Sequence, residues 1–428
     1  METSSTNKLK AALLGLKTSK VNEYYFRYSM EELALLADTA QIEVITSYTQ
    51  NKHNPDSRLY FGKGKITEIA EDIKIKKPDI IIVDDELSPS QQKNMETALR
   101  EETGLNQLKI VDRTELILLI FAQRANTKEA ILQVELAALS YQLPRLSRMW
   151  EHLGRQVGKI GTRGPGEKQI EVDRRTIRNK ISFLSDKIEE IKNQRELHRK
   201  KRLNKTIPTA AIIGYTNAGK STLLNKLTNA NVLAEDKLFA TLDTTTRKMR
   251  LPGNQEILLI DTVGFINKLP HSLVSAFRAT LEEVEEADFF IHVVDISAPN
   301  PRFLIDSVYH VLEELKVANK PMITLLNKID RLENKEILDD YRKKYYPCTG
   351  ISLKEDIGIE NAMFLIEELL SQYRKTHKVL IPFDHMNIVD FLHQKTTIIE
   401  ENYEKNGVKM EIEMKNDLLH IIKDYIIE

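Results

Sequence analysis

Short apolar runs alternate with stretches of helical periodicity over the first 126 residues of the chain. The runs that predict strands lie at residues 11–17, 43–49, 79–84 and 108–112. Residues 29–39 have the spacing of an amphipathic helix, and residues 80–83 read Ile-Ile-Ile-Val, which is typical of a parallel strand covered on both faces. The pattern therefore predicts a small layered βαβ domain over residues 1–126.

The pattern changes to a purely helical one from residue 127 to about residue 205, where two long helical stretches flank a glycine-rich break at residues 154–166. The second stretch carries a narrow apolar stripe of coiled-coil type, formed by Ile170, Ile177, Ile181, Leu184, Ile188 and Ile191. The residues of the first stretch that could face it are Ile131, Val134, Leu136 and Leu139. Packing between the two arms explains the stripe better than a cofactor or membrane role, so we predict a helical hairpin over residues 127–205.

A third domain is predicted over residues 206–373, and a small α+β appendage over residues 374–428. In the appendage, an Asn-Gly turn separates residues 396–402 from residues 408–414, which is a strong hairpin signal, and a helix is expected from residue 417.

Composition limits the classes of protein that the chain can belong to. Its 428 residues suggest two to four domains, and 41% hydrophobic with 29% charged residues is typical of a soluble globular protein. The N-terminus lacks the plan of a signal peptide and no apolar run is long enough to cross a bilayer, so we expect a cytosolic protein without membrane insertion. The lone Cys348 is interpreted as a structural thiol. Since 62 basic residues balance 63 acidic ones, any nucleic-acid site must be local.

Residues 214–221 read GYTNAGKS, which fits the phosphate-binding loop pattern, and they follow four apolar residues typical of a buried strand. Gly214 and Gly219 allow the backbone to turn its N–H groups toward phosphate oxygens, at the N-terminus of the helix that follows. Lys220 would lie on the β- and γ-phosphates, and Ser221 would offer its hydroxyl to Mg²⁺. The loop predicts a nucleoside triphosphate with magnesium as its ligand.

Two later motifs narrow the nucleotide to GTP. Asp261 ends an apolar run and begins DTVGF, where the carboxylate can hold Mg²⁺ and the Gly264 amide can meet a γ-phosphate. Residues 327–330 read NKID after another apolar run, and the carboxylate of Asp330 can accept both the ring N–H and the amino group of guanine. Ser352 is expected to contact the base by its backbone, although many G proteins have Ser-Ala where this chain has Ser-Leu. The predicted fold class is multidomain α/β, in which a P-loop GTPase domain has a mostly parallel sheet.

The segment FATLDTTTR at residues 239–247 lies where a switch segment should supply a threonine to Mg²⁺. We favour Thr241, because the segment resembles the PFTTL-like element of Obg-type GTPases. The alternatives that stay open are Thr244, Thr245 and Thr246. Phe265 occupies the position where Ras-like GTPases carry the glutamine that orients the attacking water. An aromatic side chain cannot do this, so we expect slow intrinsic hydrolysis that is completed by a partner or another part of the chain.

The members of the predicted nucleotide site carry three roles. Catalytic roles are assigned to Lys220, Thr241 and Gly264. The expected magnesium ligands are Ser221, Thr241 and Asp261. The residues expected to contact the nucleotide are Gly214, Tyr215, Thr216, Asn217, Ala218, Gly219, Lys220, Ser221, Phe239, Ala240, Thr241, Leu242, Asp243, Asp261, Thr262, Val263, Gly264, Asn327, Lys328, Asp330, Ser352, Leu353 and Lys354.

The break between the two helical arms is rich in glycine and basic residues, and this composition suits a finger that grips phosphates and bases. The residues that we expect to bind RNA are Arg145, Arg148, Trp150, Arg155, Lys159, Arg163 and Lys168. A solvated loop with incidental charge is the alternative. A second basic cluster at residues 195–205 is equally well explained as a solvated linker helix.

The chain strongly resembles the HflX family of translational GTPases, within the Obg–HflX superfamily. The resemblance rests on YFGKGKITEI at residues 60–69, on residues 112–139, on GTRGPGEKQIEVDRR at residues 161–175, and on the FATLD, DTVGF and NKID forms of the nucleotide elements. It implies a cytoplasmic, monomeric protein that binds the large (50S) ribosomal subunit and its RNA. Such a protein splits stalled or idle 70S ribosomes in the GTP state, and hydrolysis then releases it.

Some members of the family are associated with heat stress or ribosome-targeting antibiotics, so the resemblance also implies a stress response. ATP hydrolysis is attributed to some members, but GKGK at residues 62–65 is too short for a second phosphate loop. The alternative to a ribosome-associated enzyme is a signalling GTPase whose coiled-coil arm docks on a protein without RNA contact.

Overall fold

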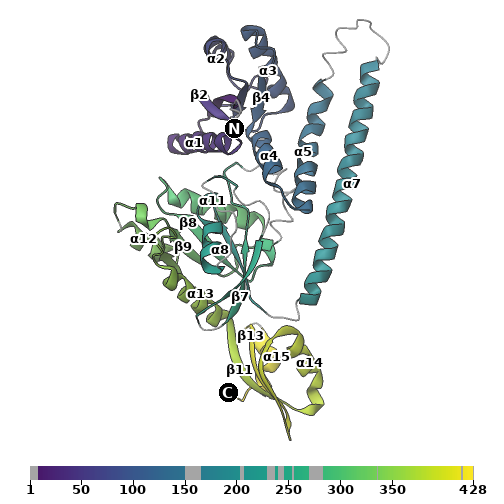
Figure 1. Ribbon diagram of the computed structural model, residues 1–428, viewed down its shortest axis with the longest axis vertical. Helices are drawn as coiled ribbons and strands as arrows, with labels where there is room; N and C mark the ends of the chain where they lie inside the picture. The colour runs from purple at the N-terminus through teal and green to yellow at the C-terminus, as the bar shows by residue number, and fades with distance from the viewer. Residues whose placement is uncertain are drawn as a thin grey trace, which may run out of the picture. The chain divides into compact units, whose positions relative to one another are not determined.

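The structure is a computed structural model of the chain. It describes residues 8–149, 165–202, 207–228, 237–239, 245–252, 255–268, 283–334, 336–415 and 418–427. The chain divides into two compact units, and its helices and strands are labelled in Figure 1. The first unit comprises residues 1–189, 235–243 and 266–278, and the second comprises residues 190–234, 244–265 and 279–428.

The first unit contains a four-stranded sheet in the order β2-β1-β3-β4, and all of its neighbouring strands are parallel. Its strands are β1 (Lys10–Lys17), β2 (Glu43–Asn51), β3 (Ile80–Val83) and β4 (Lys109–Asp112). Its helices are α1 (Glu23–Thr39), α2 (Lys63–Lys76), α3 (Pro89–Thr103) and α4 (Arg113–Arg124). Every residue of β3 is buried, as its uninterrupted apolar sequence predicts for a central parallel strand. The four strands predicted here are confirmed.

Local signals in the sequence fix the ends of these helices. Ser88 and Gln91 form a capping box at the start of α3, and Gly104 ends that helix in the left-handed conformation, at φ 75°. Asp112, the last residue of β4, also caps α4, since its side chain accepts a hydrogen bond from the Glu115 amide at 2.9 Å. The turn from β4 into α4 is therefore short and polar.

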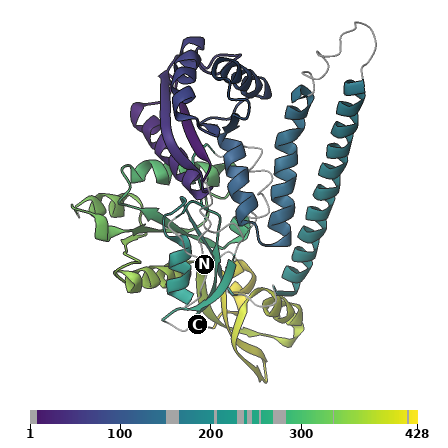
Figure 2. The ribbon, with the colours of Figure 1, turned by 45° about the horizontal axis from the view of Figure 1, so that its top comes forward.

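Two helices, α5 (Lys128–Met149) and α7 (Pro165–Arg202), follow this sheet and lie side by side in both ribbon views (Figures 1 and 2). Glu135 of α5 and Lys180 of α7 form an ion pair at 2.5 Å. Val134 and Leu184 of the predicted stripes are buried. Ile131 is 49% exposed, so its expected place between the arms is wrong.

The second unit contains a six-stranded sheet in the order β10-β9-β8-β5-β7-β6. Its strands are β5 (Thr209–Gly214), β6 (Thr245–Arg250), β7 (Glu256–Asp261), β8 (Phe289–Asp295), β9 (Met322–Asn327) and β10 (Cys348–Gly350). Only β6 runs antiparallel to its neighbour among the described strands of this sheet, which confirms the mostly parallel sheet. The helices are α8 (Lys220–Thr228), α11 (Pro301–Glu314), the 3₁₀ helix η1 (Ile329–Arg331), α12 (Ile337–Lys344) and α13 (Ile359–Tyr373).

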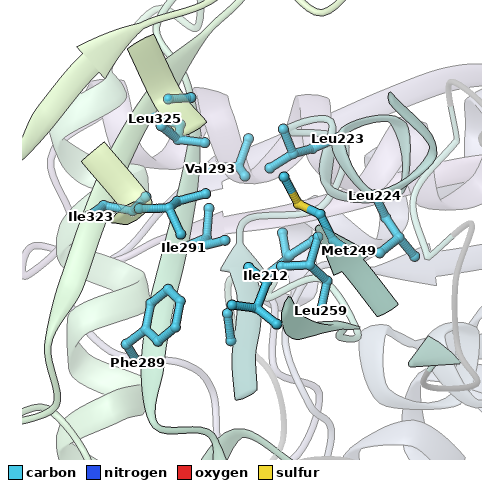
Figure 3. Packing of buried hydrophobic residues seen from close by; sticks show 14 of the residues in the cluster. Ile212, Leu223, Leu224, Met249, Leu259, Phe289, Ile291, Val293, Ile323 and Leu325 are labelled. Carbon is cyan, nitrogen blue, oxygen red and sulfur yellow. The ribbon is translucent and has the colours of Figure 1, made fainter. Parts of the chain in front are cut away.

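Buried aliphatic side chains from β5, β7, β8 and β9 pack against Leu223 and Leu224 of α8 in the core of this unit (Figure 3). The core therefore holds the first helix after β5 firmly against the sheet, and both elements border the loop at residues 215–219.

A separate three-stranded antiparallel sheet in the order β11-β13-β12 completes the second unit. Its elements are β11 (Arg374–Ile381), η2 (Phe383–His385), α14 (Met386–Lys395), β12 (Thr397–Glu404), β13 (Gly407–Lys415), α15 (Leu419–Ile422) and η4 (Lys423–Tyr425). The hairpin predicted at the Asn-Gly turn is present, whereas the helix expected from residue 417 is the single short turn α15. Across the described residues, the helices lack the combination of length and hydropathy needed to cross a bilayer.

Candidate nucleotide-binding site

At both ends of the loop between β5 and α8, the backbone adopts a conformation that only glycine can take without strain. Gly214 has φ 149°, and a Cβ there would lie 2.2 Å from the Val293 carbonyl oxygen. Gly219 has φ 103°, and a Cβ there would lie 2.4 Å from the Asn327 Nδ2 atom. Both glycines are thus required by sterics and by φ, as expected for a loop whose N–H groups turn inward.

Lys220 begins α8 and is buried, with its Nζ donating a hydrogen bond to the Tyr215 carbonyl oxygen at 2.8 Å. Burial lowers the pKa of this amine to about 8, and the negative charge of Asp261 opposes the shift. Thr216 in the same loop has a buried hydroxyl without a hydrogen-bond partner among the described residues. A buried cation and an unsatisfied hydroxyl on one loop are the groups that a phosphate would satisfy.

Ser221 and Asp261 form a pair of oxygen ligands beside this loop. The Ser221 Oγ atom donates to Asp261 Oδ2 at 2.7 Å, and Asp261 is fully buried at the end of β7. Next to it, the Thr262 hydroxyl donates to the Ile212 carbonyl oxygen at 2.7 Å and ties β7 to β5. One hydroxyl and one carboxylate fit Mg²⁺, which takes few protein ligands and completes its shell with phosphate oxygens and water. When bound, the ion would offset negative charge on the nucleotide.

The segment after Asp261 is joined to the phosphate loop through its backbone. The Phe265 amide donates to the Gly214 carbonyl oxygen at 3.1 Å, and the Thr216 amide donates to the Phe265 carbonyl oxygen at 2.8 Å. A Cβ at Gly264 would lie 2.8 Å from Lys220 Nζ and from Thr216 Cα. The Gly264 amide is thereby placed next to the loop, and the Phe265 side chain is 3% exposed.

Asn327 connects the phosphate loop with the base-recognition loops. Its Nδ2 donates to the Ala218 carbonyl oxygen at 2.8 Å, and its Oδ1 accepts from the Leu353 amide at 3.3 Å. Lys328 has φ 66°, and its Nζ pairs with Asp295 Oδ2 at 2.7 Å. These contacts hold the NKID residues and the loop after β10 in one framework.

The carboxylate of Asp330 is exposed and already oriented by a neighbour. Ser352 donates its hydroxyl to Asp330 Oδ1 at 2.6 Å, and this hydrogen bond is the main cause that lowers the pKa of Asp330 below its usual value. Leu353 is buried, so the Ser-Leu sequence contributes its backbone amide and packing. The Lys354 side chain is 77% exposed and lies near Glu355. Asp330 is therefore held as an ionised acceptor on an accessible surface.

The structure places only part of the predicted switch segment. The Phe239 ring packs edge-on against Phe121 of α4 at 4.6 Å between centroids, so we assign it a packing role. Thr245 and Thr246 pair with β7 as part of β6. Ala240, Thr241, Leu242, Asp243 and Thr244 lie outside the described residues.

Three family models match the chain in sequence order. They are "GTP-binding GTPase N-terminal" over residues 27–122, "GTP-binding GTPase Middle Region" over residues 124–202 and "50S ribosome-binding GTPase" over residues 209–328. The GTPase HflX of Caldanaerobacter subterraneus subsp. tengcongensis is 43% identical over 427 residues, covering 100% of this chain and 96% of the relative. The chain belongs to the HflX family of GTPases.

Membership in the HflX family makes the chain a GTP-binding and GTP-hydrolysing enzyme, and it confirms the resemblance seen in the sequence. The GTPase HflX of Escherichia coli strain K12 is 40% identical over 387 residues, covering 90% of this chain and 89% of the relative. A crystal structure of SsGBP with GDP aligns with 85% of this chain and 99% of its own, at 27% identity and a TM-score of 0.48. The match to the GTPase model over residues 209–328 includes the loop at residues 214–221, Asp261 and Asn327.

The residues expected to bind RNA are described only in part for this HflX-family chain. Arg145 is occupied within the protein: its guanidinium donates to the Leu87 carbonyl oxygen at 2.8 Å, to Gln92 Oε1 at 3.1 Å and to Asp112 Oδ2 at 3.3 Å. It also stacks over the Tyr141 ring at 3.4 Å. Arg145 therefore has a structural role, and we leave it out of the RNA-binding set.

The structure does not describe the side chains of the other residues that we expect to bind RNA. Arg148 lies in α5 and Lys168 in α7, but their side chains are outside the described part of the structure. Trp150, Arg155, Lys159 and Arg163 lie outside the described residues altogether. Their role stays a prediction.

Sequence reasoning missed a buried charge network in the first unit. Arg113 is 1% exposed and donates to Asp84 Oδ1 at 2.8 Å, and Lys268 approaches the same carboxylate at 2.5 Å. A signal was present in the sequence, since acidic residues directly follow the buried strand β3. Its cationic partners are distant in sequence, so periodicity could not identify them.

Proposed function

We propose that this HflX-family GTPase binds the large ribosomal subunit in its GTP state, splits idle or stalled 70S ribosomes, and is released when the ribosome stimulates hydrolysis. The observation that carries the proposal is the presence of Phe265 at the position of the water-orienting glutamine. Its ring is buried and its backbone is bonded on both sides to the phosphate loop, so the residue at the water-orienting position cannot activate water. A GTPase built in this way needs activation from elsewhere.

The match of residues 209–328 to the "50S ribosome-binding GTPase" model supports the ribosome as the source of that activation. Mg²⁺ would be held by Ser221, Asp261 and Thr241. The basic tip supplies the RNA contact through a set of six side chains. These are Arg148, Trp150, Arg155, Lys159, Arg163 and Lys168. The protein acts in the cytoplasm as a monomer.

The test is sedimentation of purified 70S ribosomes with the full chain and GTP, a non-hydrolysable GTP analogue, or GDP. We expect subunits to separate with GTP, the protein to stay on the 50S peak with the analogue, and GDP to have no effect. Asp330→Asn provides the matched control, since it should split ribosomes with xanthosine triphosphate but not with GTP. A 70S peak that stays intact, with nucleotide bound and the protein absent from all ribosomal fractions, would refute the proposal.

The rate of hydrolysis is a second readout of the same proposal. Turnover should rise steeply when 50S subunits or 70S ribosomes are added, because they complete the site that Phe265 leaves without a water-orienting group. Fast turnover by the isolated protein would contradict the role that we give to Phe265.

A further inference from the structure

The NKID segment carries a lysine, Lys328, that is held from the neighbouring strand. Lys328 Nζ lies 2.7 Å from Asp295 Oδ2, and the two side chains are 17% and 19% exposed. Ion pairs on an open surface contribute little, because water screens them and both side chains must be ordered. In a largely buried pair, by contrast, removing one partner leaves a poorly solvated charge behind. The contact with Asp295 therefore constrains the lysine side chain.

The sheet and a nearby serine fix the position of the Asp295 carboxylate. Asp295 is the last residue of β8, and the parallel pairing with β9 sets it opposite Asn327. The ladder continues past the strand, since the Ile296 amide donates to the Asn327 carbonyl oxygen at 3.0 Å. The amide and the hydroxyl of Ser297 donate to Asp295 Oδ1 at 3.0 Å and 2.6 Å. One carboxylate oxygen is thus used by Ser297 and the other by Lys328.

The backbone of Lys328 has a conformation that a lysine does not favour. Its φ of 66° lies in the left-handed region, which residues other than glycine rarely adopt and which persists where the surroundings determine it. Lys328 directly precedes the 3₁₀ helix η1, and the Arg331 amide donates to the Lys328 carbonyl oxygen at 3.0 Å. Asp330 is the middle residue of η1. The conformation of Lys328 therefore sets the direction in which the chain reaches Asp330.

Each of the three polar residues of NKID has a partner on a different element. Asn327 donates to the Ala218 carbonyl oxygen of the phosphate loop at 2.8 Å. Asp330 accepts a hydrogen bond from Ser352, in the loop after β10, at 2.6 Å. Lys328 lies between these two residues in the sequence and is held by the end of β8. A site that is ordered before the ligand arrives avoids the cost of ordering it on binding, so all three contacts favour nucleotide binding.

Two features favour a role in nucleotide binding over a role in stability alone. The segment is joined to the sheet without the ion pair, since the Ile329 amide donates to the carbonyl oxygen of the buried Ile351 at 3.3 Å. The ion pair also lies at the carboxyl ends of β8 and β9, the same edge of the sheet from which the phosphate loop leaves β5. Ligands of α/β sheets bind at that edge.

We infer that Asp295 is a positioning residue for guanine recognition, which acts by holding Lys328 at the start of the turn that presents Asp330. The inference rests on the assignment of Asp330 to the base. GDP and GTP carry the same base, so loss of Asp295 should weaken the binding of both equally and leave the hydrolysis rate at saturating GTP unchanged. A contact that only stabilised the fold would lower the melting temperature and change neither affinity. A contact that served the γ-phosphate would change the affinity for GTP alone, and either result would exclude the inference.

The experiment measures the Kd of GDP and of a non-hydrolysable GTP analogue, single-turnover hydrolysis at saturating GTP and the melting temperature, all on the full chain without ribosomes. For Asp295→Ala we expect both nucleotides to bind about fivefold more weakly, in the usual range of coupling between contacting residues, with the saturated rate within about twofold of the original. Asp295→Asn keeps an oxygen acceptor without the charge and should lose about twofold. Lys328→Met keeps the length of the side chain without its charge. If Asp295 acts through Lys328, adding Asp295→Ala to Lys328→Met should cause less than about twofold further loss.

Asp339→Ala is the matched control, because Asp339 pairs with Arg342 at 3.3 Å in the same unit, and it should leave both affinities unchanged. Asp330→Asn tests the assignment on which the inference rests, and it should lower the affinity for both guanine nucleotides. If it does so while folded Asp295→Ala keeps the original affinities, or while the losses of Asp295→Ala and Lys328→Met add in full, the inference is overturned. If Asp295→Ala does not fold, unchanged affinities in Asp295→Asn overturn it. If Asp330→Asn keeps the original affinities, the base assignment fails and the inference with it. These readouts need no ribosome, so they are independent of the splitting assay.

Discussion

Replacing Asp330 with asparagine should change the preferred nucleotide from GTP to xanthosine triphosphate. The carboxylate is exposed and oriented by the 2.6 Å hydrogen bond from Ser352, so it can accept two N–H groups of guanine. Hydrogen bonds to a charged acceptor contribute about 1.5–3 kcal/mol each, so losing both costs about 3–6 kcal/mol, or roughly 10²- to 10⁴-fold in GTP affinity. Xanthine carries a carbonyl where guanine has its amino group, and the asparagine amide can donate to it.

Competition binding with a fluorescent guanine nucleotide measures this change, with GTP, xanthosine triphosphate and ATP as competitors. Ser352→Ala is the matched control: it removes one hydrogen bond of about 1 kcal/mol, so it should weaken GTP binding about fivefold without favouring xanthosine triphosphate. A loss of GTP affinity below tenfold in Asp330→Asn, or a preference unchanged between the two purines, would refute the assignment of Asp330 to the base.

Further outcomes are expected for substitutions of Ser352, Arg113, Arg145 and Arg163. Ser352→Ala should raise the pKa of Asp330 toward its usual value. Since binding needs the carboxylate, the loss of GTP affinity on acidification below about pH 5 should begin at a higher pH in the variant, and an identical profile would exclude this link. Arg113→Ala leaves buried carboxylates uncompensated and should lower the free energy of unfolding in urea by about 3–5 kcal/mol, against under 1 kcal/mol if the pair is dispensable. Arg145→Ala should lower the melting temperature and leave ribosome affinity unchanged, whereas Arg163→Ala should weaken ribosome binding and reduce its salt dependence, as 50S co-sedimentation at several salt concentrations can show.

Much of the nucleotide site was predictable because its parts follow strands in a fixed order. Parallel strands end at the same edge of a sheet, so the loop after β5, Asp261 at the end of β7 and Asn327 at the end of β9 had to lie near one another. The structure places Ser221 within 2.7 Å of Asp261 and Ser352 within 2.6 Å of Asp330. Local apolar patterns and short motifs sufficed for these contacts.

The errors and omissions have a common physical origin in tertiary contacts. In the sequence, Arg145 lies close to the basic, glycine-rich break and was grouped with it. In the structure, Asp112 and the Leu87 carbonyl oxygen bind its guanidinium in the first unit. Lys268 and Asp84 are 184 positions apart, and no periodicity links them. Strand β11 was missed because Arg374–Ile381 has four basic side chains, which mask the alternation that buries Val379 and Ile381.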